Sequence, residues 1–217
     1  MFLIILSIIF NTTFAQNSQW AKSWGGIYPY DCGRAMCQDS DGNIYVAGIL
    51  QGSLPDDPFH RYAIFDSDTI YIRGANDFFL AKYDSSGNKL WVKRFGSSYD
   101  NWWDQREEDA TDIIYNPLTN AIYLTGSFVN SCSYGAIILH GVDAEIFIAK
   151  FDLNGNCIWA KSAGSPGIDY SSSMTISSSN NIYVAGGVMY NAMFDTIFIP
   201  HHSGFLAKYD DNGNCNG

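Results

Sequence analysis

Short segments of alternating apolar and polar residues recur along the chain. In "FLAKYD", residues 79–84, the side chains of Phe79, Ala81 and Tyr83 would share one face of an extended strand. "NIYVAG", residues 43–48, is rich in β-branched and aromatic residues and ends at a glycine, which is typical of a strand. No long segment repeats its apolar residues with the helical period of about 3.6 residues. The pattern therefore predicts an all-β chain.

The predicted strands form a repeat whose internal spacing is constant. Asp31 precedes Tyr45 by 14 positions and Phe79 precedes Trp91 by 12, and both separations return in later copies. The recurring landmarks are an aspartate (Asp31, Asp109, Asp169), the tyrosine of an "IYVAG"-like strand (Tyr45, Tyr123, Tyr183), the first residue of "FLAKYD" (Phe79, Phe147, Phe205) and the tryptophan of a "WxK" strand (Trp20, Trp91, Trp159). The tryptophans are 71 and then 68 positions apart. Constant spacing within units and variable spacing between them indicates packed strands joined by variable loops.

Each unit contains four predicted strands, which we label a to d. In the second unit they are "DATDIIYN", "NAIYLTGSF", "EIFIAKFD" and "CIWAKSAG". The segments "DSSGN", "DLNGN" and "DDNGN" have the Asp, Asn and Gly composition of a tight turn between strands c and d. Four-stranded units repeated along a chain match the blades of a β-propeller.

The motifs "GNxxWxKxxG", "GNIYVAG" and "FLAKYD" resemble the bacterial seven-bladed β-propeller repeat family, of the secreted SBBP type. The resemblance covers Trp20 to the end of the chain. It implies an exported, often outer-surface protein, and the family has no shared catalytic residues to transfer. We expect blades at roughly residues 31–94, 109–162 and 169–217, with an extra N-terminal strand at 19–25.

About three blades are fewer than the roughly four to eight of a closed propeller. The sequence therefore favours a fragment of a larger propeller. The alternative is that residues 19–25 close the last blade and two chains assemble a six-bladed ring, so a homodimer is expected if the chain is complete.

Residues 1–15 have the features of a secretory signal peptide. Phe2 to Phe10 is apolar apart from Ser7, and the small residues Thr13 and Ala15 precede a cleavage point at Gln16. No Lys or Arg follows Met1, so either the true start lies upstream or the signal is atypical. The mature chain, residues 16–217, is expected to be secreted or on the outer cell surface of a bacterium, with no membrane insertion after cleavage. Export permits disulfides, but five cysteines are an odd number.

The net charge of -10 argues against nucleic acid and anionic membranes as partners. No zinc-ligand spacing and no "GxSxG" motif occurs, so we predict no catalytic residues, no metal and no cofactor. Calcium in the Asp-rich turns is the alternative, but Gly155 is fourth in its turn where a calcium loop has its glycine sixth.

The repeated Lys82, Lys150 and Lys208 are predicted to pair with the repeated aspartates or to tie strands together. His60, His140, His201 and His202 are predicted to be surface residues, the last two pointing to opposite faces of a strand.

One connection departs from the repeat. Gly96 and Asp109 are 13 positions apart, against 6 and 5 for the equivalent pairs, and the extra segment reads "NWWDQREED". Aromatic rings can stack on sugars while acids accept hydroxyl hydrogen bonds, so the segment is a candidate site for a glycan or a cell-surface protein. Packing of the tryptophans in the propeller mouth, or a glycosidase acid/base pair, are the alternatives. The candidate residues are Trp102, Trp103, Asp104, Arg106, Glu107 and Glu108.

Length variation is expected on one edge of the blades. The d-to-a and b-to-c connections vary in length and leave from the same edge, whereas the a-to-b and c-to-d turns are constant. The b-to-c segments contain possible extra strands, "TIYIR" and "TIFIP". We therefore predict a binding or scaffold module for glycan or protein partners. A propeller enzyme such as a carbohydrate-active hydrolase or lyase, and a purely structural array, are the alternatives.

Overall fold

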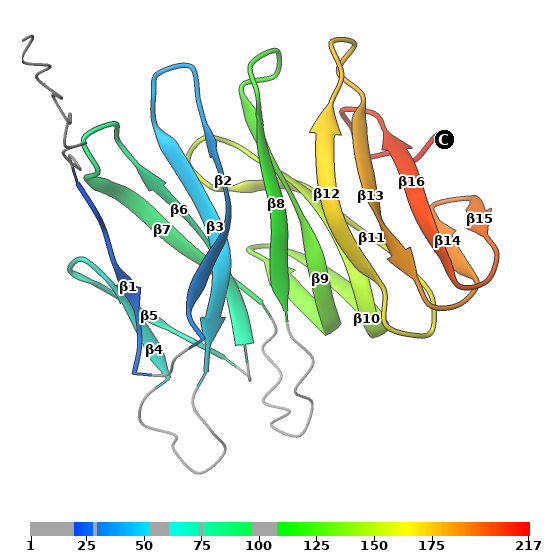
Figure 1. The fold of residues 1–217 in the computed structure, drawn as a ribbon, viewed down its shortest axis with the longest axis horizontal. Coiled ribbons are helices and arrows are strands. Elements are labelled where there is room, and N and C mark those ends of the chain that lie inside the picture. The colour runs from blue at the N-terminus through cyan, green and yellow to red at the C-terminus, as the bar shows by residue number, and fades with distance from the viewer. Residues whose placement is uncertain (1–19, 28–29, 53–60, 74–75, 97–107) are drawn as a thin grey trace, which may run out of the picture.

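The computed structural model describes residues 20–27, 30–52, 61–73, 76–96 and 108–217. These residues form antiparallel sheets and contain no helix, which confirms the all-β prediction. Three larger sheets stand side by side as the blades of a partial β-propeller (Figure 1). No helix in the described ranges is long and apolar enough to cross a membrane.

Each larger sheet is an antiparallel meander: strands a, b, c and d are neighbours in the first two blades, and strands a, b and c are neighbours in the third, where the described residues form only an isolated bridge, Tyr209 with Cys215, in place of the expected fourth strand. The "IYVAG" and "FLAKYD" strands pair in all three blades, as the spacing predicts. The first blade contains β2 (Cys32–Gln38), β3 (Ile44–Gln51), β6 (Asn76–Tyr83) and β7 (Lys89–Phe95); the second contains β8 (Asp109–Asn116), β9 (Ala121–Tyr134), β10 (Ile137–Phe151) and β11 (Cys157–Ala163); the third contains β12 (Tyr170–Ile176), β13 (Ile182–Val188) and β16 (Ser203–Tyr209).

The b-to-c connections contain an additional hairpin. It is β4 (Tyr62–Phe65) with β5 (Asp68–Tyr71) in the first blade and β14 (Ala192–Phe194) with β15 (Ile197–Ile199) in the third. In the second blade the same hairpin is the continuation of β9 and β10. The sequence prediction of extra strands at "TIYIR" and "TIFIP" is therefore confirmed.

In the second and third blades the hairpin pairs with the residue directly after the last strand of the blade before it. In the second blade Ser133 pairs with Gly96, and in the third Met193 pairs with Gly164. In the first blade Ile64 pairs with Gly25 of β1 (Trp24–Gly25), so β1 occupies the place that strand d of a preceding blade would have. Aromatic side chains of the hairpins pack inward, with Phe194 4.7 Å from Phe205 between ring centroids.

The turn sequence "DxxGN" occurs four times with one hydrogen-bonding pattern. In the copy after β10, one carboxylate oxygen of Asp152 accepts the amides of Asn154 and Asn156, and the other accepts the side-chain amide of Asn156 at 2.8 Å. The glycine of each copy has a positive φ between 72° and 83°, which explains why glycine recurs there. The copies begin at Asp39, Asp84, Asp152 and Asp210.

The glycine that ends "IYVAG" allows close packing inside each blade. A Cβ at Gly48 would collide with the carbonyl oxygen of Cys32 and would lie 2.9 Å from a ring carbon of Phe79. Gly126 and Gly186 are enclosed in the same way. Each lies beside a β-bulge in strand a, which brings that strand close to strand b.

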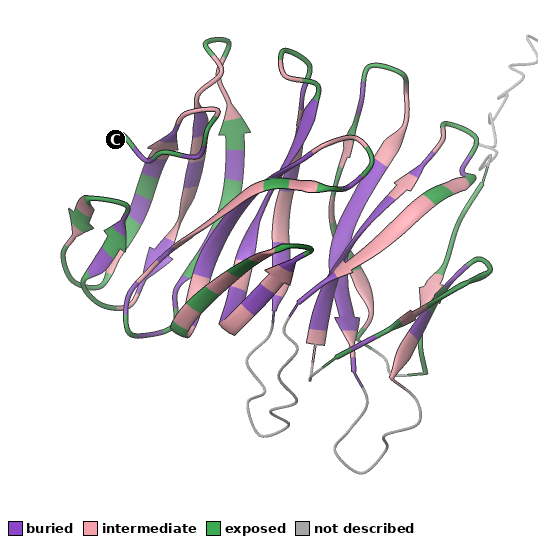
Figure 2. Ribbon diagram, turned by 180° about the vertical axis from the view of Figure 1, so that it is seen from behind, coloured by how far each residue is buried: buried purple, intermediate pink, exposed green. Residues whose placement is uncertain are grey.

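Apolar cores fill the spaces between neighbouring blades (Figure 2). Between the first and second blades the rings of Phe78 and Phe147 stack 5.0 Å apart. Between the second and third blades Ile148 and Tyr123 pack with Val184 and Ala207. The blades therefore bury their apolar side chains mainly against one another.

The equal spacing of Asp31, Asp109 and Asp169 does not correspond to equal places in the fold. Cys32 and Tyr170 follow Asp31 and Asp169, and each pairs with the residue four positions after the repeat tyrosine. In the second blade Asp109 itself has that pairing, so Glu108 is the equivalent of Asp31 and Asp169. The reason is that strand a and its turn are one residue longer relative to Tyr123.

Two of the three repeated lysines, Lys82 and Lys150, form ion pairs, but with other aspartates than the landmark ones. Lys82 lies 3.5 Å from Asp39, in the turn between β2 and β3, and Lys150 lies 2.8 Å from Asp211. Asp31 and Asp169 instead accept backbone amides, from Gln51 and Met189 respectively. These two carboxylates therefore hold the start of strand a against the end of strand b.

All five cysteines lie in the described ranges, and each is a free thiol. Burial, with the nearby Asp39 and Asp112 carboxylates, raises the pKa of Cys37 to about 12. Burial also raises the pKa of Cys157 to about 12. These thiols are therefore protonated near neutral pH.

Candidate functional site

The variable connections all begin and end on one edge of the blades, which we call the connection edge. In the first blade Gln51 pairs with Asn76 and Phe78 with Phe95, so strand b ends where strand c begins and where strand d ends. The second blade has the same arrangement, and in the third blade strand b likewise ends where strand c begins, because Val188 pairs with Ser203. The opposite edge carries the short a-to-b and c-to-d turns, of which the a-to-b turn of the second blade is one residue longer than the others.

The connection edge of the third blade contains a hollow of about 460 Å³. Three segments that are distant in the sequence line it: the d-to-a connection, the end of strand b and the turn before strand c. The lining residues are Pro166, Met189, Tyr190, Asn191, His201 and His202.

Hydrogen bonds fix the walls of this hollow. The buried Asp169 accepts the amide of Met189 at 2.8 Å and the hydroxyl of Ser165 at 2.9 Å. Ser165 Oγ in turn accepts the amide of Tyr190, and Asn191 accepts the amide of His201 at 3.0 Å. Asp169, one of the aspartates that recur in the repeat, therefore also fixes the positions of the segments that line the hollow.

Two aromatic side chains give the hollow its chemistry. The rings of Tyr190 and His202 lie 5.4 Å apart, and 49% of Tyr190 is exposed. An exposed tyrosine ring, an imidazole and a neighbouring amide can together stack on a ligand and exchange hydrogen bonds with it. His201 and His202 lie in a turn with a positive φ at His201, so the prediction that they point to opposite faces of a strand is wrong.

Five of the six candidate residues predicted from the "NWWDQREED" segment lie outside the described residues, namely Trp102, Trp103, Asp104, Arg106 and Glu107. Their role in binding stays a prediction. Glu108 is described and is 4% exposed, at the place of the structural carboxylates Asp31 and Asp169. Its side chain lies at the start of β8, on the connection edge.

Glu108 faces a second buried carboxylate, that of Asp77. A Cβ added at Gly96 would collide with both Glu108 Oε2 and Asp77 Oδ1, so the two groups converge on one point. Asp77 Oδ2 accepts a hydrogen bond from Arg94 at 2.6 Å and from the backbone amide of Arg73 at 2.7 Å. Burial raises the pKa of Asp77 to about 7, while the Arg94 guanidinium and the Arg73 amide oppose that rise.

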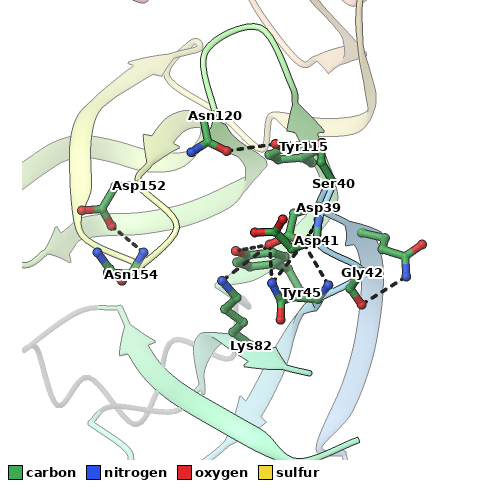
Figure 3. Close-up of polar contacts among 12 residues, drawn as sticks. Asp39, Ser40, Asp41, Gly42, Tyr45, Lys82, Tyr115, Asn120, Asp152 and Asn154 are labelled. Carbon is green, nitrogen blue, oxygen red and sulfur yellow. Dashed lines mark hydrogen bonds and ion pairs between the residues drawn. The ribbon is translucent and has the colours of Figure 1, made fainter. Parts of the chain in front are cut away.

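The short turns on the opposite edge use their carboxylates internally (Figure 3). Asp39 accepts hydrogen bonds from the Asn43 side chain and from Tyr45 Oη at 3.0 Å, and Lys82 lies beside it. Because these oxygens already have amide and hydroxyl donors, the turn explanation accounts for all four copies. No group of three or more His, Cys, Asp or Glu side chains within the described ranges is placed to hold a metal ion. The prediction that these turns bind no calcium awaits a calcium titration by calorimetry.

Sequence reasoning missed the hollow beside Tyr190. Its residues come from three segments, and their proximity depends on the extra hairpin that precedes β16. The available signal was the variable length of the b-to-c connection combined with Tyr190 and His202 at its two ends. Only the register of β13 with β16 brings those ends together.

Comparison with known proteins agrees with the blade architecture. No protein-family model matches the chain. The chain is 28% identical over 190 residues to an uncharacterised WD repeat-containing protein of Acanthamoeba polyphaga mimivirus. The match covers 77% of this chain but 13% of that protein, so the chain spans a small part of its relative. Together with the three blades, this similarity indicates a β-propeller-type repeat family.

Proposed function

We propose that the chain is part of a secreted or cell-surface β-propeller repeat protein that acts as a binding scaffold for a glycan or protein partner. The connection edge is the binding surface. The observation that carries this proposal is the hollow beside Tyr190 and His202, on the edge where most of the length variation lies. The similarity to a WD repeat-containing protein supports a scaffold role.

Two parts of this proposal rest on sequence motifs: that the protein is secreted, and that its repeats are of the bacterial secreted type. Residues 1–15 have the apolar stretch and small residues of a signal peptide. "GNxxWxKxxG" and its companion motifs support repeats of the bacterial secreted type. The residues that bound the insert, Gly96 and Glu108, lie on the connection edge, so we include Trp102 and Trp103 in the proposed surface.

The test is binding of the purified chain to an array of glycans and cell-surface proteins. The double variants Tyr190→Ala/His202→Ala and Trp102→Ala/Trp103→Ala should each lose at least about tenfold in affinity, because aromatic anchors dominate such contacts. Their unfolding free energies should change by no more than about 1 kcal/mol, as is usual for surface positions. Ser86→Ala, in an exposed turn on the opposite edge, is the matched control and should change neither quantity.

Two outcomes would contradict the proposal. Failure of the unmodified chain to bind any array member would favour the purely structural array. A loss of about 3–5 kcal/mol on truncating the tryptophans, with binding unchanged, would assign them to packing.

A further inference from the structure

At the interface between the second and third blades, side chains of the second blade bind one carboxylate of the third, that of Asp211. Lys150 Nζ donates to both oxygens of Asp211 at 2.8 Å, and Tyr123 Oη also donates to this carboxylate. Trp159 Nε1 donates to the backbone carbonyl of Asp211 at 3.0 Å. Burial opposes ionisation of Asp211, but the hydrogen bonds from Lys150 and Tyr123 outweigh it and lower the pKa. Asp211 belongs to the c-to-d turn of the third blade, directly after the first aspartate of "DDNGN".

The first blade satisfies its equivalent lysine in another way. Tyr45 and Lys82 are paired across their strands as Tyr123 and Lys150 are. Their carboxylate comes from Asp39 in the a-to-b turn of the same blade. The c-to-d turn of the following blade has Leu153 where the third blade has Asp211, and Leu153 packs on the shared core. In the first two blades, therefore, each tyrosine and lysine pair obtains one carboxylate, either from its own blade or from the next.

The third blade has the same tyrosine and lysine pair, but within the described structure neither its own a-to-b turn nor a following blade supplies a carboxylate. Tyr183 and Lys208 are paired across β13 and β16. The a-to-b turn of this blade begins at Ser177, in the place of Asp39, and so offers no carboxylate there. Among the described residues no acid lies within ion-pair distance of Lys208 Nζ.

The surface around Tyr183 and Lys208 has the apolar character of an inter-blade face. Leu206 is 68% exposed, whereas its equivalents Leu80 and Ile148 are fully buried against the following blade. We call Tyr183, Ala185, Leu206 and Lys208 the front face of the third blade. It is the side away from the second blade, because the alternate residues Val184 and Ala207 pack in the core shared with that blade.

We propose that the front face docks a further blade of this repeat, and specifically one whose c-to-d turn has an acidic residue directly after its first aspartate. Leu206 would be covered as Leu80 and Ile148 are, and the acid would take the place that Asp211 has against Lys150 and Tyr123. Charge complementarity thus selects the neighbour, while apolar burial holds it. This inference concerns contacts between blades and does not depend on the proposed binding surface.

The first blade of a second copy does not meet this requirement. Its c-to-d turn reads "DSSGN", with Ser85 in the place of Asp211. The remaining geometry is present, because Trp20 lies over Gly87 as Trp159 lies over Gly213. A single substitution, Ser85→Asp, would therefore make the first blade complementary to the front face of another copy.

The test compares self-association of full-chain variants by analytical ultracentrifugation. Ser85→Asp should associate at least about tenfold more tightly than the unmodified chain, with an effect that weakens as salt rises. Ser86→Asp adds the same charge one position along the same turn and should leave association unchanged. Ser85→Asp/Lys208→Met should lose the gain with itself, yet form a 1:1 complex with the unmodified chain, which still has Lys208.

Two results would overturn the proposal. One is equal association of the Ser85→Asp and Ser86→Asp variants. The other is a gain that survives Lys208→Met. Circular dichroism on each variant confirms that the comparison is between folded chains.

Discussion

Asp211 connects two blades through a side chain that is one-third exposed. Three groups from the second blade hold it, and the core around Tyr123 surrounds the contact on one side. A charged hydrogen bond in such a place contributes more than an ion pair on the open surface. The contribution of this residue is therefore measurable as coupling between blades.

A double-mutant cycle on Asp211→Asn and Lys150→Met should give a coupling energy of about 1–2 kcal/mol in urea unfolding. The matched control is the pair Lys22 and Asp66, which are 3.7 Å apart and more exposed. Its coupling should stay below about 0.5 kcal/mol. Equal coupling in the two cycles would mean that Asp211 is an ordinary surface charge.

The turn aspartates act locally and respond to acid. Asp152→Ala removes the acceptor of three hydrogen bonds and should cost about 2 kcal/mol, whereas Asn154→Ala should cost less than about 0.5 kcal/mol because only its backbone amide is bonded.

Burial raises the pKa of Asp152, but hydrogen bonds from Asn156 and Asn154 outweigh it and lower the pKa. The stabilisation is therefore complete above the unfolded-state value of 3.8 and is lost as pH falls below it. Urea titrations at pH 6 and pH 3 should show the difference between Asp152→Ala and the unmodified chain shrinking at the lower pH.

At the scale of elements, the hairpin in each b-to-c connection joins neighbouring blades. It pairs directly after strand d of the preceding blade, or with β1 in the first blade, and packs an aromatic ring beneath it. The d-strand tryptophan makes a second contact near the opposite edge, where Trp91 lies over Gly155. Neighbouring blades are thus connected at both edges as well as through their cores.

The ring of Phe194 gives a direct measure of the hairpin contact. Phe194 is fully buried against Phe205, so Phe194→Ala should cost about 3–5 kcal/mol by leaving a cavity. Phe198→Ala, on the partner strand β15 with 56% of its side chain exposed, should cost less than about 1 kcal/mol. Thermal unfolding of the two variants distinguishes them; similar losses would show that the hairpin is not anchored by Phe194.

Strand type and strand order could be predicted from the sequence because alternation and spacing are local properties. The place of Asp109 could not, because strand a and its turn are one residue longer in the second blade and equal spacing hides this shift. The hollow beside Tyr190 depends on long-range register, which no local pattern contains. The sequence also could not predict the ion-pair partners of Lys82 and Lys150, because each lysine can pair with an aspartate of its own blade or of the next blade.

At the scale of the whole molecule, titrating groups act on stability in opposite directions. The turn aspartates stabilise the fold above about pH 4. Asp77 has the reverse effect, because burial raises its pKa to about 7 and the folded state therefore binds a proton more tightly than the unfolded state. Its contribution is fully present below the unfolded value of 3.8 and is lost as pH rises to about 7.

The unfolding free energy should consequently fall between about pH 4 and pH 7. Asp77→Asn cannot ionise and should flatten that fall, even if it lowers stability overall by weakening the contact with Arg94. Urea unfolding at unit pH steps measures the slope. An unchanged slope in the variant would show that Asp77 does not cause the dependence.

The placement of the hairpins also gives the chain a direction of assembly. Each hairpin binds a segment that precedes it in the sequence, so its partner has always left the ribosome before the hairpin itself emerges. A growing chain can therefore add one blade at a time onto a finished surface. Synthesis would then set the order in which the blades fold, and would limit the time during which the apolar face of each new sheet is exposed to solvent.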